Sequence, residues 1–170
     1  GHAPGLTGKE LAAYRLLGVF TDHECTTFQE ALEKLRCGMT IQVREGSAAR
    51  NLDAILTGAV EMGLPLDRFV FCTDDKHLDD IAREGHIRWN VGVPPGEAVK
   101  MATLYPARLY GLSDLGAIAP GFRADLVVLD SLEEMAVHSV YKDGVLVSRK
   151  GSSPTLPPNP RPIDPACLDT

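Results

Sequence analysis

Short apolar runs typical of β-strands alternate along this chain with segments that have helical spacing. The strand-like runs cover 19–24, 39–46 and 69–73, and a helical pattern follows each of them. Strands separated by helices predict a parallel sheet of the α/β class, as in a TIM-type barrel or a doubly wound fold. A complete (β/α)8 barrel needs roughly 250 residues. A chain of 170 residues therefore has room for about half of one.

Two residues set expectations for the helices. Ser47 precedes a helical pattern that ends at Gly63, and we expect its side chain to cap that helix. Pro106 lies inside the helical pattern over 96–112. Because proline removes a backbone donor and clashes with the preceding turn, this segment is expected to kink or to form two helices.

The pattern changes after Leu112, where a partial barrel over 1–112 is expected to give way to a small β module over 113–148. This second part contains short apolar runs with Asp143-Gly144 between two of them. An Asp-Gly pair between apolar runs is a strong signal for a hairpin. The remaining segment, 149–170, is rich in proline and is predicted to be a disordered tail.

Charge and composition argue against two classes of partner. The net charge is -6 and aromatic residues make up only 6%, which speaks against binding nucleic acid. No apolar run approaches the roughly 20 residues that a membrane-spanning helix requires. The four cysteines form no C-x-x-C pair and no secretory leader is visible, so we expect free thiols and a cytoplasmic location.

Ionisable side chains follow each predicted strand. The residues concerned are Asp22, His23 and Glu24, then Arg44 and Glu45, then Asp74 and Asp75, with His2 near the start of the chain. The carboxyl ends of parallel strands share one edge of the sheet, where active sites collect. Imidazole and carboxylate together suit a divalent transition metal, so a metal site is predicted at this edge.

Each of these residues also has a structural interpretation when it is taken alone. His23 and Asp74 could cap the helices that follow them, and Arg44 and Glu45 could form a salt-bridged strand end instead of contacting a ligand. It is their occurrence together, in this order, that favours the metal site.

Four motifs in this order, "GHAPG", "TDHE", "QVREGS" and "FCTDD", resemble the adenine deaminase family of the amidohydrolase superfamily. The resemblance covers roughly residues 1–147 and extends to "AVKMATLYPARLYGL" and "DLGAIAPGFRADLVVLD". It implies the C-terminal half of a (β/α)8 barrel, strands five to eight, followed by a small β-sandwich module. The N-terminal half of the barrel, which carries a His-x-His pair and a bridging carboxylate in the family, has no counterpart here.

The resemblance also implies a binuclear metal centre and a reaction. His2 and His23 would ligate one metal, and Asp74 would bind the other and act as a base. The metal would be Mn²⁺ or Fe²⁺, with Zn²⁺ possible. The reaction would be the hydrolytic deamination of adenine to hypoxanthine and ammonia, a step of purine salvage.

Further roles follow for neighbouring residues. Glu24 is a second candidate for moving protons, because it adjoins His23. Asp22 is a candidate for orienting an imidazole. Arg44, Glu45 and His86 are candidates for binding the purine.

Two other readings stay open. The chain could belong to an amidohydrolase that hydrolyses another cyclic amide. It could also be a non-catalytic half-barrel, because an open half-barrel exposes sheet edges and apolar surface. Such a chain is expected to form a homo-oligomer or to pair with the missing N-terminal half.

Overall fold

The computed structural model describes residues 1–85, 92–132 and 134–152, which form two compact units. The first unit runs from Gly1 to Gly116 and the second begins at Ala117. His86, Cys167 and most of the proline-rich segment lie outside the described residues.

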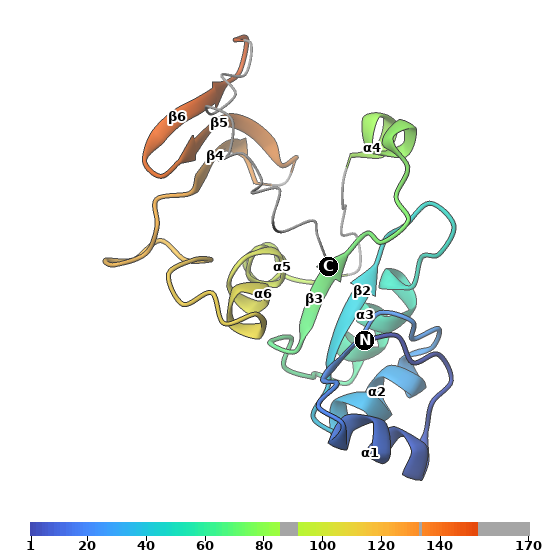
Figure 1. Ribbon diagram of the computed structural model, residues 1–170. Helices are drawn as coiled ribbons and strands as arrows, with labels where there is room; N and C mark the ends of the chain where they lie inside the picture. Colours follow the sequence, from blue (N-terminus) through green and yellow to red (C-terminus); the bar gives the residue numbers. More distant parts are fainter. Residues whose placement is uncertain (86–91, 133, 153–170) are drawn as a thin grey trace, which may run out of the picture. The chain divides into compact units, whose positions relative to one another are not determined.

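The first unit is built on a parallel sheet of three strands in the order β1-β2-β3 (Figure 1). The strands are β1 (Thr21–Asp22), β2 (Thr40–Arg44) and β3 (Phe69–Cys72). Helix α2 (Phe28–Arg36) connects the first two strands and α3 (Leu52–Glu61) connects the last two. The expected alternation of strand and helix and the parallel sheet are thus both present in the fold.

The core of this unit lies where helices pack on the two longer strands. Ile41 and Val43 of β2 are fully buried, as is Phe69 of β3. On α3, Ile55 and Leu56 are fully buried and belong to the same apolar cluster. Side chains alternate along a strand, so the intervening residues of β2 are left to its other face.

The helix after β2 begins four residues later than a cap at Ser47 would place it, and Ser47 does not cap it. Helix α3 starts at Leu52, while the Ser47 hydroxyl contacts Asp80 and accepts a hydrogen bond from the His77 amide at 2.8 Å. The Asn51 amide donates to the Arg44 carbonyl at 3.0 Å, so the chain forms a closed loop over 45–50 before the helix can begin. Local capping preference is overridden here by these longer-range bonds.

The segment around Pro106 forms two helices, as one of the two expectations stated. They are α5 (Pro95–Ala102) and α6 (Leu104–Leu109), separated at Thr103. Pro106 falls in the first turn of α6, where backbone N–H groups have no partner within the helix, so the missing donor costs little there. Helices α1 (Gly8–Leu16) and α4 (Leu78–Glu84) complete the unit.

The described residues of the second unit form one antiparallel sheet in the order β4-β5-β6. Its strands are β4 (Leu126–Ser131), β5 (Ala136–Lys142) and β6 (Val145–Arg149). Asp143 and Gly144 join the last two strands with φ values of 51° and 79°, the left-handed conformation of a type I′ hairpin turn. The expected hairpin is therefore confirmed.

The expected β-sandwich is not seen in the described part of this unit, because a sandwich requires two sheets and these residues form one. Strand β6 also continues through Arg149, one residue beyond the expected end of the module. Among the described residues, no helix is both long and apolar enough to cross a membrane.

Candidate metal centre

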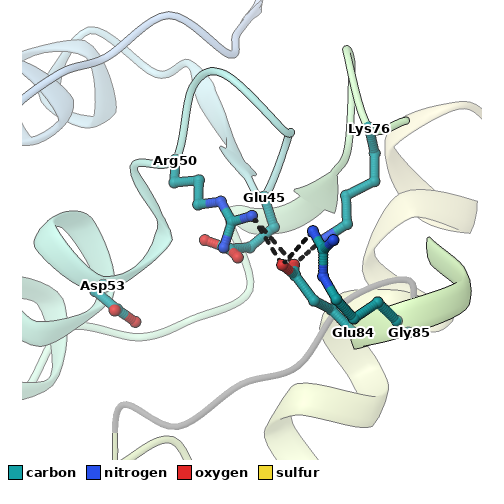
Figure 2. Close-up of a pocket in the computed structure, with 7 residues that line it drawn as sticks. Glu45, Arg50, Asp53, Lys76, Glu84 and Gly85 are labelled. Atoms are coloured by element: carbon teal, nitrogen blue, oxygen red, sulfur yellow. Dashed lines mark hydrogen bonds and ion pairs between the residues drawn. The ribbon is translucent and has the colours of Figure 1, made fainter. Parts of the chain in front are cut away.

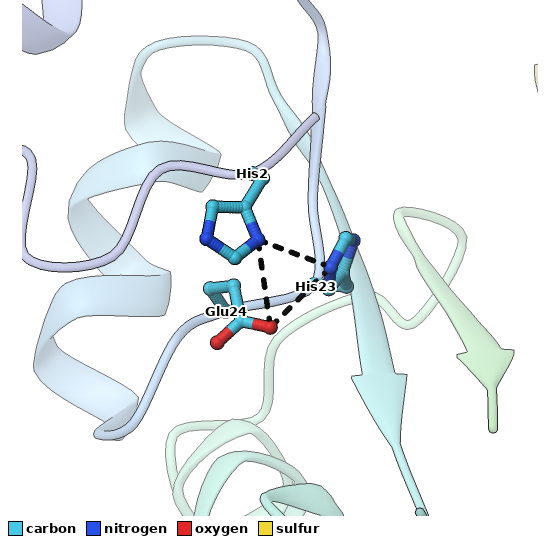
Figure 3. Close-up of side chains that lie close together, drawn as sticks. All are labelled: His2, His23 and Glu24. Carbon is cyan, nitrogen blue, oxygen red and sulfur yellow. Dashed lines mark hydrogen bonds and ion pairs between the residues drawn. The ribbon is translucent and has the colours of Figure 1, made fainter. Parts of the chain in front are cut away.

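Two histidines and a carboxylate converge at the end of β1 (Figure 3). His2 Nδ1 lies 3.4 Å from His23 Nε2. The Glu24 Oε1 atom lies 3.6 Å from His2 Nδ1 and 3.3 Å from His23 Nε2. The His2 side chain is 64% exposed, whereas those of His23 and Glu24 are only 22% and 17% exposed. The cluster is therefore open to solvent mainly at His2.

The donor set and its spacing fit a divalent metal. All three ligand atoms lie within 4.8 Å of one another. Two nitrogens bound at 2.0–2.1 Å to one metal stand about 2.8–3.4 Å apart in octahedral or tetrahedral geometry. The observed separation of 3.4 Å between His2 Nδ1 and His23 Nε2 lies at the upper end of that range.

Arg44 links the third member of this cluster to Asp74. Its Nη1 contacts Glu24 Oε1 and donates to Asp74 Oδ2 at 2.7 Å, and its Nη2 donates to Glu24 Oε2 at 3.3 Å. Arg44 ends β2, Glu24 follows β1 and Asp74 follows β3. The central strand of the sheet thus supplies the cation that joins carboxylates from its two neighbours.

Asp74 is linked to this cluster by its hydrogen bond with Arg44. Its carboxylate is not one of the ligand atoms that converge with those of His2 and His23. The group of converging ligand atoms contains Glu24 in its place. Asp74 has a φ of 51°, a left-handed conformation that is uncommon outside glycine and asparagine or aspartate. Its side chain is 43% exposed, so its carboxylate can still meet a ligand from solvent.

Backbone contacts hold both histidines in place. The His2 amide donates to the Tyr14 hydroxyl at 3.2 Å. The buried Asn51 side chain donates to the carbonyls of His23 at 3.2 Å and Cys25 at 2.8 Å, and its oxygen accepts from the Arg44 amide at 2.6 Å. Asn51 therefore ties the loop after β1 to the end of β2.

Glu45, which directly follows β2, faces a different set of groups from Arg44. It lines a charged pocket of about 380 Å³, together with Arg50, Asp53, Lys76, Arg83, Glu84 and Gly85 (Figure 2). Burial raises the pKa of the Glu45 carboxyl. Glu84 accepts from Lys76 Nζ at 3.0 Å and from Arg50 Nη2 at 3.1 Å, so two of the cations in this pocket are already paired.

Comparison with known proteins agrees with this geometry. The model of the amidohydrolase family matches residues 1–147. This chain belongs to the amidohydrolase family. The match covers the whole first unit, the second unit as far as residue 147, and every residue of the cluster around His23.

Among curated amidohydrolases, the chain is similar to several adenine deaminases. It is 56% identical over 156 residues to the enzyme of Desulfitobacterium hafniense and 48% identical over 157 residues to that of Kosmotoga olearia. These alignments cover 88% and 89% of this chain but 27% of each relative. The chain thus spans about a quarter of the length of these relatives, and the resemblance inferred from the four motifs is confirmed.

A solved structure supports the fold. The beta-aspartyl dipeptidase of Fervidobacterium islandicum has a TM-score of 0.57 over 77% of this chain and 40% of its own, at 23% sequence identity. This likeness concerns the fold alone. Amidohydrolases generally use a divalent metal, which agrees with the donor set of His2, His23 and Glu24.

A second cluster, missed by the sequence analysis, lies in the interior beside His23. Lys34 and Asp22 are both 0% exposed, and Lys34 Nζ donates to Asp22 Oδ2 at 2.8 Å and to Glu30 Oε1 at 2.6 Å. Burial alone would lower the pKa of Lys34, but its hydrogen bonds to Asp22 and Glu30 outweigh burial and raise it. The i,i+4 spacing of Glu30 and Lys34 was the available signal, although it is typical of solvated helix faces.

Proposed function

We propose that this chain forms part of a metal-dependent adenine deaminase, which converts adenine and water to hypoxanthine and ammonia. The observation that carries the proposal is the convergence of His2, His23 and Glu24 at a strand end. The similarity to curated adenine deaminases at 44–56% identity supports the choice of substrate. The chain would contribute the sixth, seventh and eighth strands of the barrel as β1, β2 and β3, with His2 at the end of the fifth. The partner half would supply the remaining ligands.

The proposal assigns His2 and His23 to a metal, Mn²⁺ or Fe²⁺ with Zn²⁺ as an alternative. Asp74 is proposed as ligand to a second metal. When bound, such a metal lowers the pKa of water from 15.7 to about 7, which makes hydroxide available at neutral pH. The position of Glu24 Oε1, close to both imidazoles, supports a role for Glu24 as a ligand in addition to that of a proton carrier.

Proton transfer in the proposal falls to the two carboxylates that Arg44 holds. Asp74 takes a proton from water and delivers it to the departing nitrogen, because an amine leaves readily only once it is protonated. Arg44 keeps Asp74 and Glu24 oriented through its two Nη atoms. Its bonds to these carboxylates favour positioning over direct contact with the purine.

Glu45 and His86 complete the proposed purine site. Glu45 is proposed to contact the purine from the pocket that it lines, where burial raises the pKa of its carboxyl. His86 lies outside the described residues, and its role is carried only by its place in the motif. A cytoplasmic location and a homo-oligomer or a pairing with the missing half remain parts of the proposal.

The test is ammonia release from adenine in the presence of Mn²⁺ or Fe²⁺. It compares the parent chain with His23→Ala, and with His77→Ala as a control outside the cluster. We expect the chain to become active when it is supplied with the N-terminal half of a close relative, and His23→Ala to abolish that activity. Ring opening of hydantoin or dihydropyrimidine, with no ammonia released from adenine, would favour the alternative of another cyclic-amide hydrolase.

A further inference from the structure

In the buried cluster of Asp22, Glu30 and Lys34, every hydrogen-bond donor of the lysine has an acceptor within the chain. The Lys34 ammonium has three donors. They reach Asp22 Oδ2 at 2.8 Å, Glu30 Oε1 at 2.6 Å and the Ala3 carbonyl at 2.6 Å. No donor is left for solvent, and the side chain is fully buried.

The two carboxylates also accept hydrogen bonds from the backbone of the loops. Asp22 Oδ1 accepts from the Ala3 amide at 2.8 Å, so both backbone groups of Ala3 are held by the cluster. Glu30 accepts from the amides of Gly5 at 2.8 Å and Thr26 at 3.0 Å. Ala3 adjoins His2, and Asp22 itself adjoins His23. The cluster therefore fixes the backbone next to both histidines.

Stability does not explain such a cluster. Taking charged groups out of water is costly, and replacing a buried ion pair by uncharged groups of similar shape is often neutral or stabilising. What a fully bonded buried network does provide is one fixed arrangement of the groups that it joins. Here those groups are the two loops that carry the imidazoles.

The cluster is not a second metal site. Asp22, Cys25 and Glu30 do offer three ligand atoms within 4.8 Å of one another. However, the Lys34 ammonium already bonds both carboxylates, and a cation in that space would have to displace it. Burial raises the pKa of the Cys25 thiol, so a thiolate ligand is also disfavoured there.

We propose that Asp22 and Lys34 are positioning residues that hold the His2 and His23 rings at metal-binding distance. This inference rests on the proposed function for its consequence, metal affinity. Its structural content, the ring arrangement, does not depend on the metal. Asp22 acts here through the backbone of Ala3, and not by bonding an imidazole as the sequence analysis expected.

The experiment uses the uncharged pair Lys34→Met with Asp22→Asn, which keeps the shapes of both side chains. Glu30, whose side chain is 9% exposed, loses its cation but keeps its bonds to the amides of Gly5 and Thr26. The matched control is Lys76→Met with Glu84→Gln, since Lys76 is only 4% exposed and is likewise paired with a carboxylate. The single variant Asp22→Asn is a milder alternative should the double variant fail to fold. Circular dichroism melting curves establish that each variant is folded.

Two readouts separate positioning from stability. The first is the nuclear Overhauser effect between the His2 and His23 rings, measured in the metal-free chain. The centroids of these two rings lie 5.3 Å apart. The second is the Kd for Mn²⁺ from its paramagnetic resonance signal. In the folded Lys34/Asp22 variant we expect the ring contact to disappear and Mn²⁺ binding to weaken by about 10–100-fold, the scale for groups that orient ligands. The control should retain both.

The outcomes are distinct. A ring contact that persists in the folded variant, or that is absent from the parent, overturns the positioning inference whatever the metal does. Mn²⁺ affinity unchanged in the variant overturns it as well. A parent chain with the ring contact but without Mn²⁺ binding counts against the proposed function alone, because loss of the contact in the variant would still support positioning.

Discussion

Arg44 donates to Asp74 across the top of the sheet, from Nη1 to Oδ2 at 2.7 Å, and the same Nη1 contacts Glu24. The strand order β1-β2-β3 makes this possible, because Arg44 ends the central strand and the two carboxylates follow its neighbours. One guanidinium can serve two carboxylates since it presents five donors in a planar fork.

Replacing this arginine should destabilise the first unit. Arg44→Met leaves the 17%-exposed Glu24 without its cation, and hydrogen bonds to charged groups contribute about 1.5–3 kcal/mol. We expect the free energy of unfolding in urea to fall by roughly 2 kcal/mol. The double variant with Glu24→Gln should recover part of that loss.

A surface pair provides the comparison. Arg83 is 67% exposed and contacts Asp80, so Arg83→Met should change the unfolding free energy by less than about 1 kcal/mol. Equal decreases in the free energy of unfolding for Arg44→Met and Arg83→Met would show that Arg44 stabilises the fold no more than an exposed surface pair does.

The strand ends were predictable because the alternation of strands and helices, and the shared edge of parallel strands, can both be inferred from short stretches of sequence. Apolar runs separated by helical patterns placed the three strands, and the rule for parallel sheets placed His2, His23 and Arg44 at one edge. The start of α3 was not predictable from Ser47, because the bonds that displace it come from Arg44, His77 and Asp80. These residues are distant in sequence or belong to another element.

The buried charge cluster was invisible for a related reason. A Glu-Lys pair with i,i+4 spacing normally faces solvent, and only the folded chain shows Lys34 at 0% exposure beside Asp22. The contact between Glu24 and both imidazoles also depends on where the N-terminal loop returns. Sequence spacing carries no such information, since His2 and His23 are 21 residues apart.

Two glycines in helices should respond to alanine with opposite signs. A Cβ on Gly58 of α3 would lie 2.3 Å from Cγ of the Phe28 ring, a distance that real contacts do not show. A Cβ on Gly96 of α5 would meet nothing within 4 Å. Alanine is better than glycine in a helix by up to about 1 kcal/mol.

We therefore expect Gly96→Ala to raise the melting temperature slightly and Gly58→Ala to lower it. Moving the Phe28 ring costs about 1–3 kcal/mol, the range for overpacking in a core, which exceeds the gain in helix propensity. Differential scanning calorimetry of both variants decides the point. Stabilisation by Gly58→Ala would mean that Phe28 moves aside freely.

Cys25 and Cys37 should differ in their reaction with iodoacetamide. Cys25 is 1% exposed and its thiol donates to Asp22 Oδ2 at 3.2 Å, whereas Cys37 is partly exposed. Burial also raises the pKa of the Cys25 thiol, which reduces the reactive thiolate. Peptide mapping should show that Cys25 is modified much more slowly than Cys37 and that denaturant removes the difference. Comparable rates in the folded chain would contradict the buried position.

The antiparallel unit contains two carboxylates whose titration tests its pairing. Asp130 accepts from Lys150 Nζ at 2.8 Å and lies 2.9 Å from His138 Nδ1, and these bonds hold its pKa below the ordinary value. Asp125 is paired in the same way with Lys142, which lowers the pKa of that carboxyl.

Because the folded pKa of Asp130 lies below its unfolded value of about 3.9, the stabilisation is complete above that pH and is lost as the pH falls through the folded pKa. Lys150→Met should raise the pKa of Asp130 toward its ordinary value and leave that of Asp125 unchanged. Lys142→Met should do the reverse. Carboxyl ¹³C shifts followed from pH 6 to pH 2 measure both groups in one sample. If either lysine variant moved both carboxyls, or neither, the strand pairing that places Lys150 beside Asp130 would be wrong.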